Sequence, residues 1–132
     1  MNISFVDRYR YFVYRKACDM RKGFDSLSGI VTNELKMDPL LGDVFVFISN
    51  RRDRIKVLHW QGDGYAIYSK RLESGTFEII KDKSNGNIIE ITSNQLQFIL
   101  SGIYLSSIKQ RKRYKHTNVS KYIAESGVSK AS

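Results

Sequence analysis

The sequence predicts an α+β fold, a largely antiparallel sheet of five or six strands that two helices pack on one face, followed by a basic C-terminal arm. Short runs rich in aromatic and β-branched residues alternate with glycine-containing turns, which is typical of strands joined in a meander. Two other segments repeat apolar residues at the helical period of 3.6. Basic residues concentrate in the last fifth of the chain, after this patterning ends.

Length and composition indicate one domain with one extension. The chain has 132 residues, of which 42% are hydrophobic, enough for a single core. We expect the domain to span residues 1–105 and the arm, flexible or with a short helix, to span residues 106–132. A single cysteine excludes an intrachain disulfide, and no apolar run reaches the roughly 20 residues of a membrane span. With no signal peptide at the N-terminus, these features predict a cytoplasmic protein without a membrane contact.

The first strand and the first helix occupy the first third of the chain. Residues 10–15 are rich in aromatic and β-branched residues and predict a strand, which could lie at the sheet border with an edge open to a partner. Asp19 suits a helix N-cap, because its carboxylate can accept from the free N–H groups of the first turn. Five apolar residues at helical spacing then form one stripe: Met20, Phe24, Leu27, Val31 and Leu35. Pro39 and Gly42 end this segment.

Most of the remaining chain up to residue 91 is predicted to form the sheet. Residues 43–48 are an unbroken apolar run after Asp43, so we expect that strand to be buried on both faces. Residues 54–60 and 65–71 form an antiparallel pair across the turn at 61–64, and residues 76–80 and 87–91 follow around Asn85 and Gly86. Thr92 and Gln95 then fit a capping box, which starts a second helix. Its apolar stripe is Leu96, Ile99, Leu100 and Ile103.

The charge balance favours a polyanionic partner. The chain has 22 Lys and Arg residues against 13 Asp and Glu residues, a net charge of +9. Within the domain the candidate nucleic-acid-binding residues are Arg51, Arg52, Arg54, Lys56, Lys70 and Arg71. In an antiparallel pair, Arg54 and Lys56 could face Lys70 and Arg71, and a bound phosphate would offset their repulsion.

Two aromatic residues accompany this surface. Trp60 and Tyr68 could stack on bases, or they could simply pack. The alternative for the whole surface is a solvated face whose charges pair with Asp53, Asp63 and Glu73.

The arm carries a second candidate site. Five of the seven residues from 109 to 115 are basic: Lys109, Arg111, Lys112, Arg113 and Lys115. Such a run can follow a nucleic-acid backbone and become ordered on contact, although a solubilising tail has the same composition.

Catalytic and cofactor motifs are missing from the sequence. The acidic residues Asp53, Asp63 and Glu73 lie in or beside expected turns, where acids are favoured for local backbone reasons. His59 and His116 are too few and too far apart for a zinc site with one cysteine. Cys18 is expected to act as a small buried apolar residue. We therefore expect no catalytic residue, no metal and no cofactor.

Five segments, in order and at the expected spacing, resemble a known family. They lie within residues 19–27, 42–47, 52–60, 64–77 and 95–103, so the resemblance covers roughly residues 10–105. The family is the insertion-sequence-66 accessory proteins, known as TnpB or second-open-reading-frame proteins of bacterial transposons. Residues 2–10 and the chain after Leu105 depart from its pattern.

The resemblance implies an accessory protein that supports transposition and has no catalytic activity of its own. Its expected partners are transposon DNA and the separate transposase. A protein adaptor that contacts only the transposase is the alternative, and a metal-dependent nuclease is a less favoured one.

Overall fold

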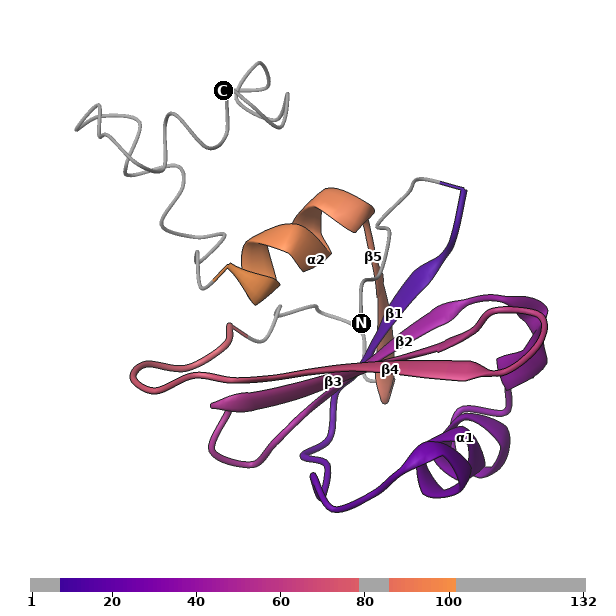
Figure 1. The fold of residues 1–132 in the computed structure, drawn as a ribbon, viewed down its shortest axis with the longest axis horizontal. Coiled ribbons are helices and arrows are strands. Elements are labelled where there is room, and N and C mark those ends of the chain that lie inside the picture. Colours follow the sequence, from indigo (N-terminus) through magenta and orange to yellow (C-terminus); the bar gives the residue numbers. More distant parts are fainter. Residues whose placement is uncertain (1–7, 79–85, 102–132) are drawn as a thin grey trace.

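The computed structural model describes residues 8–78 and 86–101, which form one five-stranded sheet and two α-helices (Figure 1). The elements in chain order are β1 (Tyr11–Tyr14), α1 (Phe24–Asn33), the short 3-10 helix η1 (Pro39–Leu41), β2 (Val44–Ile48), β3 (Arg54–Trp60), β4 (Tyr65–Arg71), β5 (Ile88–Ile91) and α2 (Ser93–Leu100). The α+β class is confirmed. None of the helices in these two ranges is long and apolar enough to cross a membrane.

The strand order is β4-β3-β2-β1-β5, and of the four pairs only β2 with β1 is parallel. β1 runs parallel to β2 and antiparallel to β5, while β2, β3 and β4 form an antiparallel meander. The prediction of a largely antiparallel sheet is therefore confirmed. The expectation that the first strand lies at a sheet border is wrong, because β1 has a neighbour on each side.

The two helices cover opposite faces of the sheet, whereas the sequence interpretation placed both on one face (Figure 1). On one face Leu27, Ile30 and Val31 of α1 pack against Phe45 and Phe47 of β2. On the other face, Leu96, Ile99 and Leu100 of α2 join a cluster with strand residues. The physical reason lies in the central strands: every residue of β1 and β2 is buried, so both faces need a cover.

The first helix begins later than the sequence predicts. Asp19 does not cap it; the Asp19 carboxylate instead accepts from the backbone N–H and the guanidinium of Arg21, 2.9 and 2.7 Å away. This bond between the Asp19 side chain and the backbone of Arg21 stabilises a local turn over residues 19–21, and such a turn competes with the start of a helix. Gly23 is the cap of α1, and no side chain bonds to that end. Met20 and Leu35, two members of the expected stripe, therefore lie outside the helix.

The sixth predicted strand is not formed where the structure describes it. Residues 76–78 are not in a strand, and the rest of that segment, with Asn85 of the expected turn, lies outside the described residues. Phe77 is fully buried instead, and its N–H donates to the Arg52 carbonyl at 2.6 Å. The capping box is confirmed, with Thr92 and Gln95 each accepting from the other's backbone N–H. Ile103 and the basic arm also lie outside the described residues.

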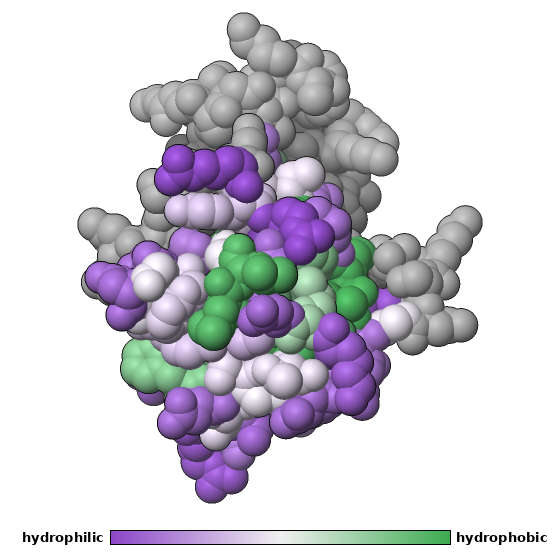
Figure 2. Space-filling model, turned by 90° about the vertical axis from the view of Figure 1, so that its right-hand side faces the viewer, coloured by the Kyte–Doolittle hydropathy of each residue, from purple (hydrophilic) through white to green (hydrophobic). Residues whose placement is uncertain are grey.

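The two ends of the sheet differ in character. One end carries η1 and the turn between β3 and β4, and Figure 2 looks onto it: hydrophobic side chains gather at the centre and hydrophilic ones surround them. The other end carries the turn between β2 and β3 and the last residues of β4. That second end holds most of the basic residues of the domain singled out by the sequence.

Candidate nucleic-acid interface

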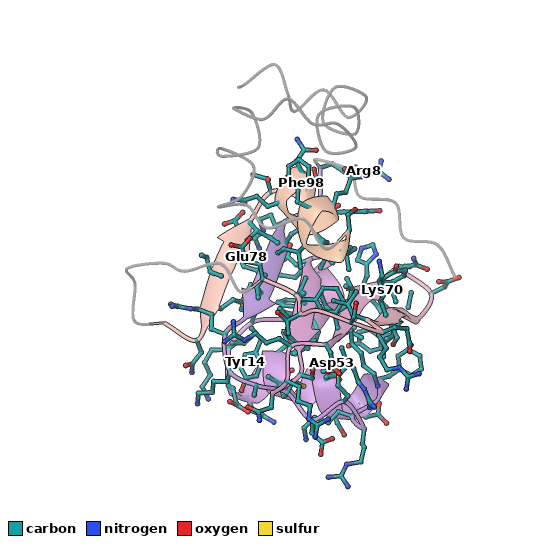
Figure 3. All side chains as sticks on the ribbon, turned by 90° about the vertical axis from the view of Figure 1, so that its left-hand side faces the viewer. Arg8, Tyr14, Asp53, Lys70, Glu78 and Phe98 are labelled. Atoms are coloured by element: carbon teal, nitrogen blue, oxygen red, sulfur yellow. The ribbon has the colours of Figure 1, made fainter. Side chains whose placement is uncertain are left out.

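Four exposed arginines lie together at the end of the sheet where β3 begins and β4 ends, and we call this the basic end. Figure 3 looks onto it, with Asp53 of the β2–β3 turn and Lys70 of β4 labelled. The four arginines are Arg51, Arg52, Arg54 and Arg71. The turn and the antiparallel pairing of β3 with β4 bring them together from two parts of the chain.

The strand register decides which of the predicted basic residues share a face. Arg54 lies directly opposite Arg71, and Lys56 lies opposite Ser69. Lys70 lies opposite Ile55, whose side chain belongs to the core beneath α2. Since alternate residues of a strand point to opposite faces, Arg54, Lys56 and Arg71 share the α1 face while Lys70 is on the other. The expectation that all four face one another is therefore wrong for Lys70.

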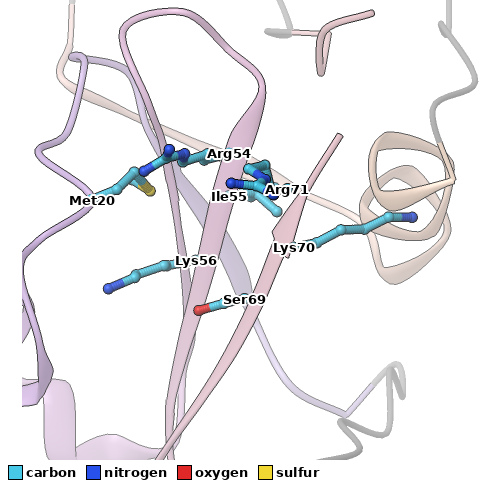
Figure 4. Close-up of a pocket in the computed structure, with 7 residues that line it drawn as sticks. All are labelled: Met20, Arg54, Ile55, Lys56, Ser69, Lys70 and Arg71. Atoms are coloured by element: carbon cyan, nitrogen blue, oxygen red, sulfur yellow. The ribbon is translucent and has the colours of Figure 1, made fainter. Parts of the chain in front are cut away.

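Two of the predicted cations bond to backbone carbonyls. Lys70 Nζ donates to the Leu100 carbonyl at the end of α2, 2.6 Å away, and Figure 4 shows its side chain pointing to that helix. Lys56 Nζ donates to the Lys22 carbonyl at 2.8 Å, in the segment before α1. Both side chains are only partly exposed. Their hydrogen bonds link α2 to β4 through Lys70, and the segment before α1 to β3 through Lys56.

The β2–β3 turn that carries Arg51 and Arg52 is held by several hydrogen bonds. The Arg52 N–H donates to the Ser49 carbonyl at 2.9 Å, and the Ser49 hydroxyl donates to the Asp53 carboxylate at 3.2 Å. The Leu72 N–H donates to the Asp53 carbonyl at 2.8 Å. Arg52 itself has a φ of 61°, in the left-handed region that non-glycine residues rarely adopt. The turn therefore presents its arginines from a fixed backbone.

Few acidic groups neutralise these arginines. Within the described ranges, Arg51, Arg52 and Arg54 have no carboxylate within salt-bridge distance. Arg71 Nη2 lies 3.4 Å from Glu73 Oε2, but both side chains are well exposed, and such pairs stabilise little. Of the acids that the solvated-face alternative invoked, only Glu73 pairs with one of the four arginines.

A groove runs across the basic end. It consists of two hollows of about 380 and 410 Å³ that share Met20 and Arg54. Figure 4 shows the residues that line the first of them. The first lies over the β3–β4 pair and the second lies between the β2–β3 turn and the segment before α1. The residues lining one or both are Cys18, Asp19, Met20, Arg21, Ser49, Asn50, Arg51, Asp53, Arg54, Ile55, Lys56, Ser69, Lys70 and Arg71. The first hollow thus offers cations and a hydroxyl, which are the groups that bind phosphate oxygens.

The sequence interpretation missed Arg21, which lines the second hollow. Its guanidinium holds the pKa of Asp19 well below the ordinary value, chiefly through the side-chain hydrogen bond. Asp19 is therefore ionised at any physiological pH, and the pair contributes little net charge. Cys18 beside them is buried, as expected, and burial raises the pKa of its thiol, so this side chain has little thiolate character.

The two candidate stacking residues do not lie among the arginines. Tyr68 packs against the core beneath α2, on the face away from Arg54. Trp60 shares the α1 face but lies at the other end of β3, six residues from Arg54, or about 20 Å along a strand. Its ring makes an edge contact with Tyr65, whose centroid is 5.0 Å away. Trp60 is thus part of a separate aromatic cluster.

Metal ligands do not gather in the described part of the chain. In residues 8–78 and 86–101, no group of three or more His, Cys, Asp or Glu side chains is placed to hold a metal ion. The five basic residues between 109 and 115 lie outside the described residues, so their role stays a prediction.

Comparison with known proteins gives the family. The chain is 40% identical to the uncharacterized protein y4hO of Sinorhizobium fredii over 85 residues, 64% of this chain and 72% of the relative. It is 29% identical to y4jC of the same organism over 110 residues, 83% of this chain and 92% of the relative. No solved structure matches it. The family model of the IS66 Orf2-like proteins matches residues 9–110, so the chain belongs to this family of insertion-sequence accessory proteins.

Proposed function

We propose that the protein supports transposition by binding the sugar-phosphate backbone of transposon DNA in the groove at the basic end, without cleaving it. The observation that carries this proposal is the direct cross-strand pairing of Arg54 with Arg71 on one face. Like charges placed opposite each other destabilise a sheet, and a bound phosphate removes that cost. The positive net charge of the whole chain acts in the same direction.

The arrangement suits backbone contacts rather than sequence reading. Arg54 and Lys56 are two residues apart on β3, or about 7 Å, and Arg71 projects beside them from β4. These cations lie on the surface of a sheet. No described helix carries them, so no helix inserts them into a DNA groove where base edges could be contacted. We therefore propose binding that tolerates any DNA sequence, with the arm at residues 109–115 adding phosphate contacts.

The test is a charge reversal at the groove, Arg54→Glu with Arg71→Glu, measured by DNA binding across a salt series. Both side chains are exposed, so the fold should be retained. We expect weaker binding and a salt slope that falls by about 0.9 for each phosphate that the variant no longer neutralises. The matched control is Lys16→Glu with Lys36→Glu, two exposed residues outside the groove that change the net charge equally.

Three outcomes are informative. A decrease in affinity confined to the groove variant supports the proposal, and an equal decrease in both variants reduces it to nonspecific attraction by net charge. Unchanged binding in both removes the groove from the site. The adaptor alternative is tested with the purified transposase of the same element: capture that ignores both salt and the groove variant would favour a protein contact over DNA.

A further inference from the structure

The end of the sheet opposite the groove carries the exposed hydrophobic residues. In the described part of the chain, the exposed large hydrophobic side chains are Phe24, Leu40 and Leu41, with exposed fractions of 48%, 52% and 69%. None of them lies at the basic end. Scattered exposed leucines are ordinary on a protein surface, whereas a contiguous set indicates an interaction site.

These residues are contiguous through two aromatic rings. The Phe24 ring stacks on Tyr65 with centroids 6.4 Å apart, and Tyr65 contacts Trp60 at 5.0 Å. Trp60 in turn lines a hollow of about 420 Å³ together with Leu40 and Leu41. We call these five residues the apolar end; it lies on the side of the molecule seen in Figure 2, where hydrophobic side chains are ringed by hydrophilic ones.

The two leucines are presented by a well-formed turn. Asp38 caps η1 by accepting from the Leu40 N–H at 2.9 Å, Pro39 occupies the first position, and Gly42 closes it with a φ of 91°. No residue of η1 is buried. The hydrogen bonds of the turn use no leucine side chain, so the turn would form with other residues at these two positions. The exposed leucine side chains are therefore not needed to form the turn.

Charge separates the apolar end from the basic end. Asp38 caps η1, and Asp63 lies in the β3–β4 turn next to Gly62, which lines the hollow. Arg8 also lies close to the hollow, with its guanidinium 5.3 Å from the ring of Tyr9, another lining residue. Asp43 is neutralised by Arg10 at 2.7 Å. Two chains of net charge +9 repel each other most strongly where their basic ends meet, so an approach through the opposite ends is favoured. Those same carboxylates disfavour nucleic acid here.

We propose that the apolar end is the contact surface of a homodimer, in which the leucines and Trp60 of one chain cover those of a second copy. A two-fold axis brings the same patch of each chain together, so a patch bordered by Arg8 and by two carboxylates can place charges of opposite sign across the contact. Five apolar residues form only the centre of a standard interface, so the dimer is expected to dissociate on dilution in the micromolar range. Each groove stays free at the far end of its chain.

The test is sedimentation velocity of the full chain from low to high micromolar concentration, for the natural sequence and two variants. Leu41→Glu puts a charge at the most exposed leucine, and Asn50→Glu puts the same charge on an exposed residue at the basic end. We expect the natural sequence and Asn50→Glu to form dimers and Leu41→Glu to stay monomeric. Added salt should favour the dimer, because it screens the repulsion between the chains.

A second readout does not depend on a variant. Trp60 is the only tryptophan, and it lines the hollow beside the leucines, so its emission should shift with the same concentration dependence as the mass. A chain that is monomeric throughout, or a dimer that survives Leu41→Glu, overturns the proposal. A monomer that binds purified transposase through Leu41, or whose Trp60 emission changes when residues 102–132 are deleted, would assign the surface to another occupant and overturn it equally.

Discussion

The hydrogen bond between Lys70 and the end of α2 predicts a stability effect that separates structure from DNA binding. Lys70→Met keeps most of the side-chain stem and removes the ammonium that donates to the Leu100 carbonyl at 2.6 Å. A hydrogen bond from a charged donor contributes about 1.5–3 kcal/mol, and the partial exposure of Lys70 favours the lower end. For a domain of this size, about 1.5 kcal/mol lowers the melting temperature by about 5–10 °C.

The assay is thermal and urea unfolding followed by circular dichroism, with Arg71→Met as the control. Arg71 is the next residue in the chain, but its side chain is 61% exposed, so its removal should change the free energy of unfolding by no more than about 0.5 kcal/mol. The two variants should have the reverse order of effect on DNA affinity per folded molecule. Affinity should fall for Arg71→Met and stay nearly constant for Lys70→Met. Equal melting temperatures for the two variants would refute the stabilising role of Lys70.

Three further predictions concern stability and DNA binding. Burial lowers the pKa of His59, so as the pH falls the unfolded chain binds a proton at this residue before the folded chain does. The free energy of unfolding should therefore be constant above the unfolded pKa of about 6.5 and decrease below it. His59→Gln should remove this part of the pH dependence. Thr92→Ala removes the N-cap of α2 and should lower the urea midpoint by an amount equivalent to about 1 kcal/mol. Trp60→Phe should leave DNA affinity unchanged, since the ring contacts Tyr65 and not the arginines; a DNA-induced shift of Trp60 emission would contradict this.

The parts of the fold that depend on neighbours in sequence were predictable. Thr92 and Gln95 are three residues apart and make their bonds locally, so the capping box could be identified without tertiary information. Asp19 shows the limit of such arguments. An aspartate side chain that can cap a helix can equally accept from the N–H two residues later and form a turn, as it does here with Arg21. Which faces the helices cover, and the place of β1 between β2 and β5, depend on long-range pairing that no local pattern records.

The candidate site also has features that were predictable from the sequence and others that were not. The antiparallel pairing of β3 with β4 was predictable from the turn between them, and it brings Arg54 opposite Arg71. The same pairing implies that neighbours such as Lys70 and Arg71 point to opposite faces, so the alternation along the strand already separates them in the sequence. The approach of Arg21 to the groove could not be predicted, because it depends on how the segment before α1 lies against the β2–β3 turn.

The left-handed backbone at Arg52 has a consequence for how the basic end can change. With a φ of 61°, this position would suit glycine without strain, while an L side chain there raises the folded-state energy by about 1–2 kcal/mol. The Arg52 N–H and carbonyl both bond to other backbone groups, to Ser49 and Phe77, so the strain cannot relax by reshaping the turn. Arg52→Gly should therefore stabilise the protein or leave it unaltered, and what it removes is a cation. Stability and charge are opposed at this single position.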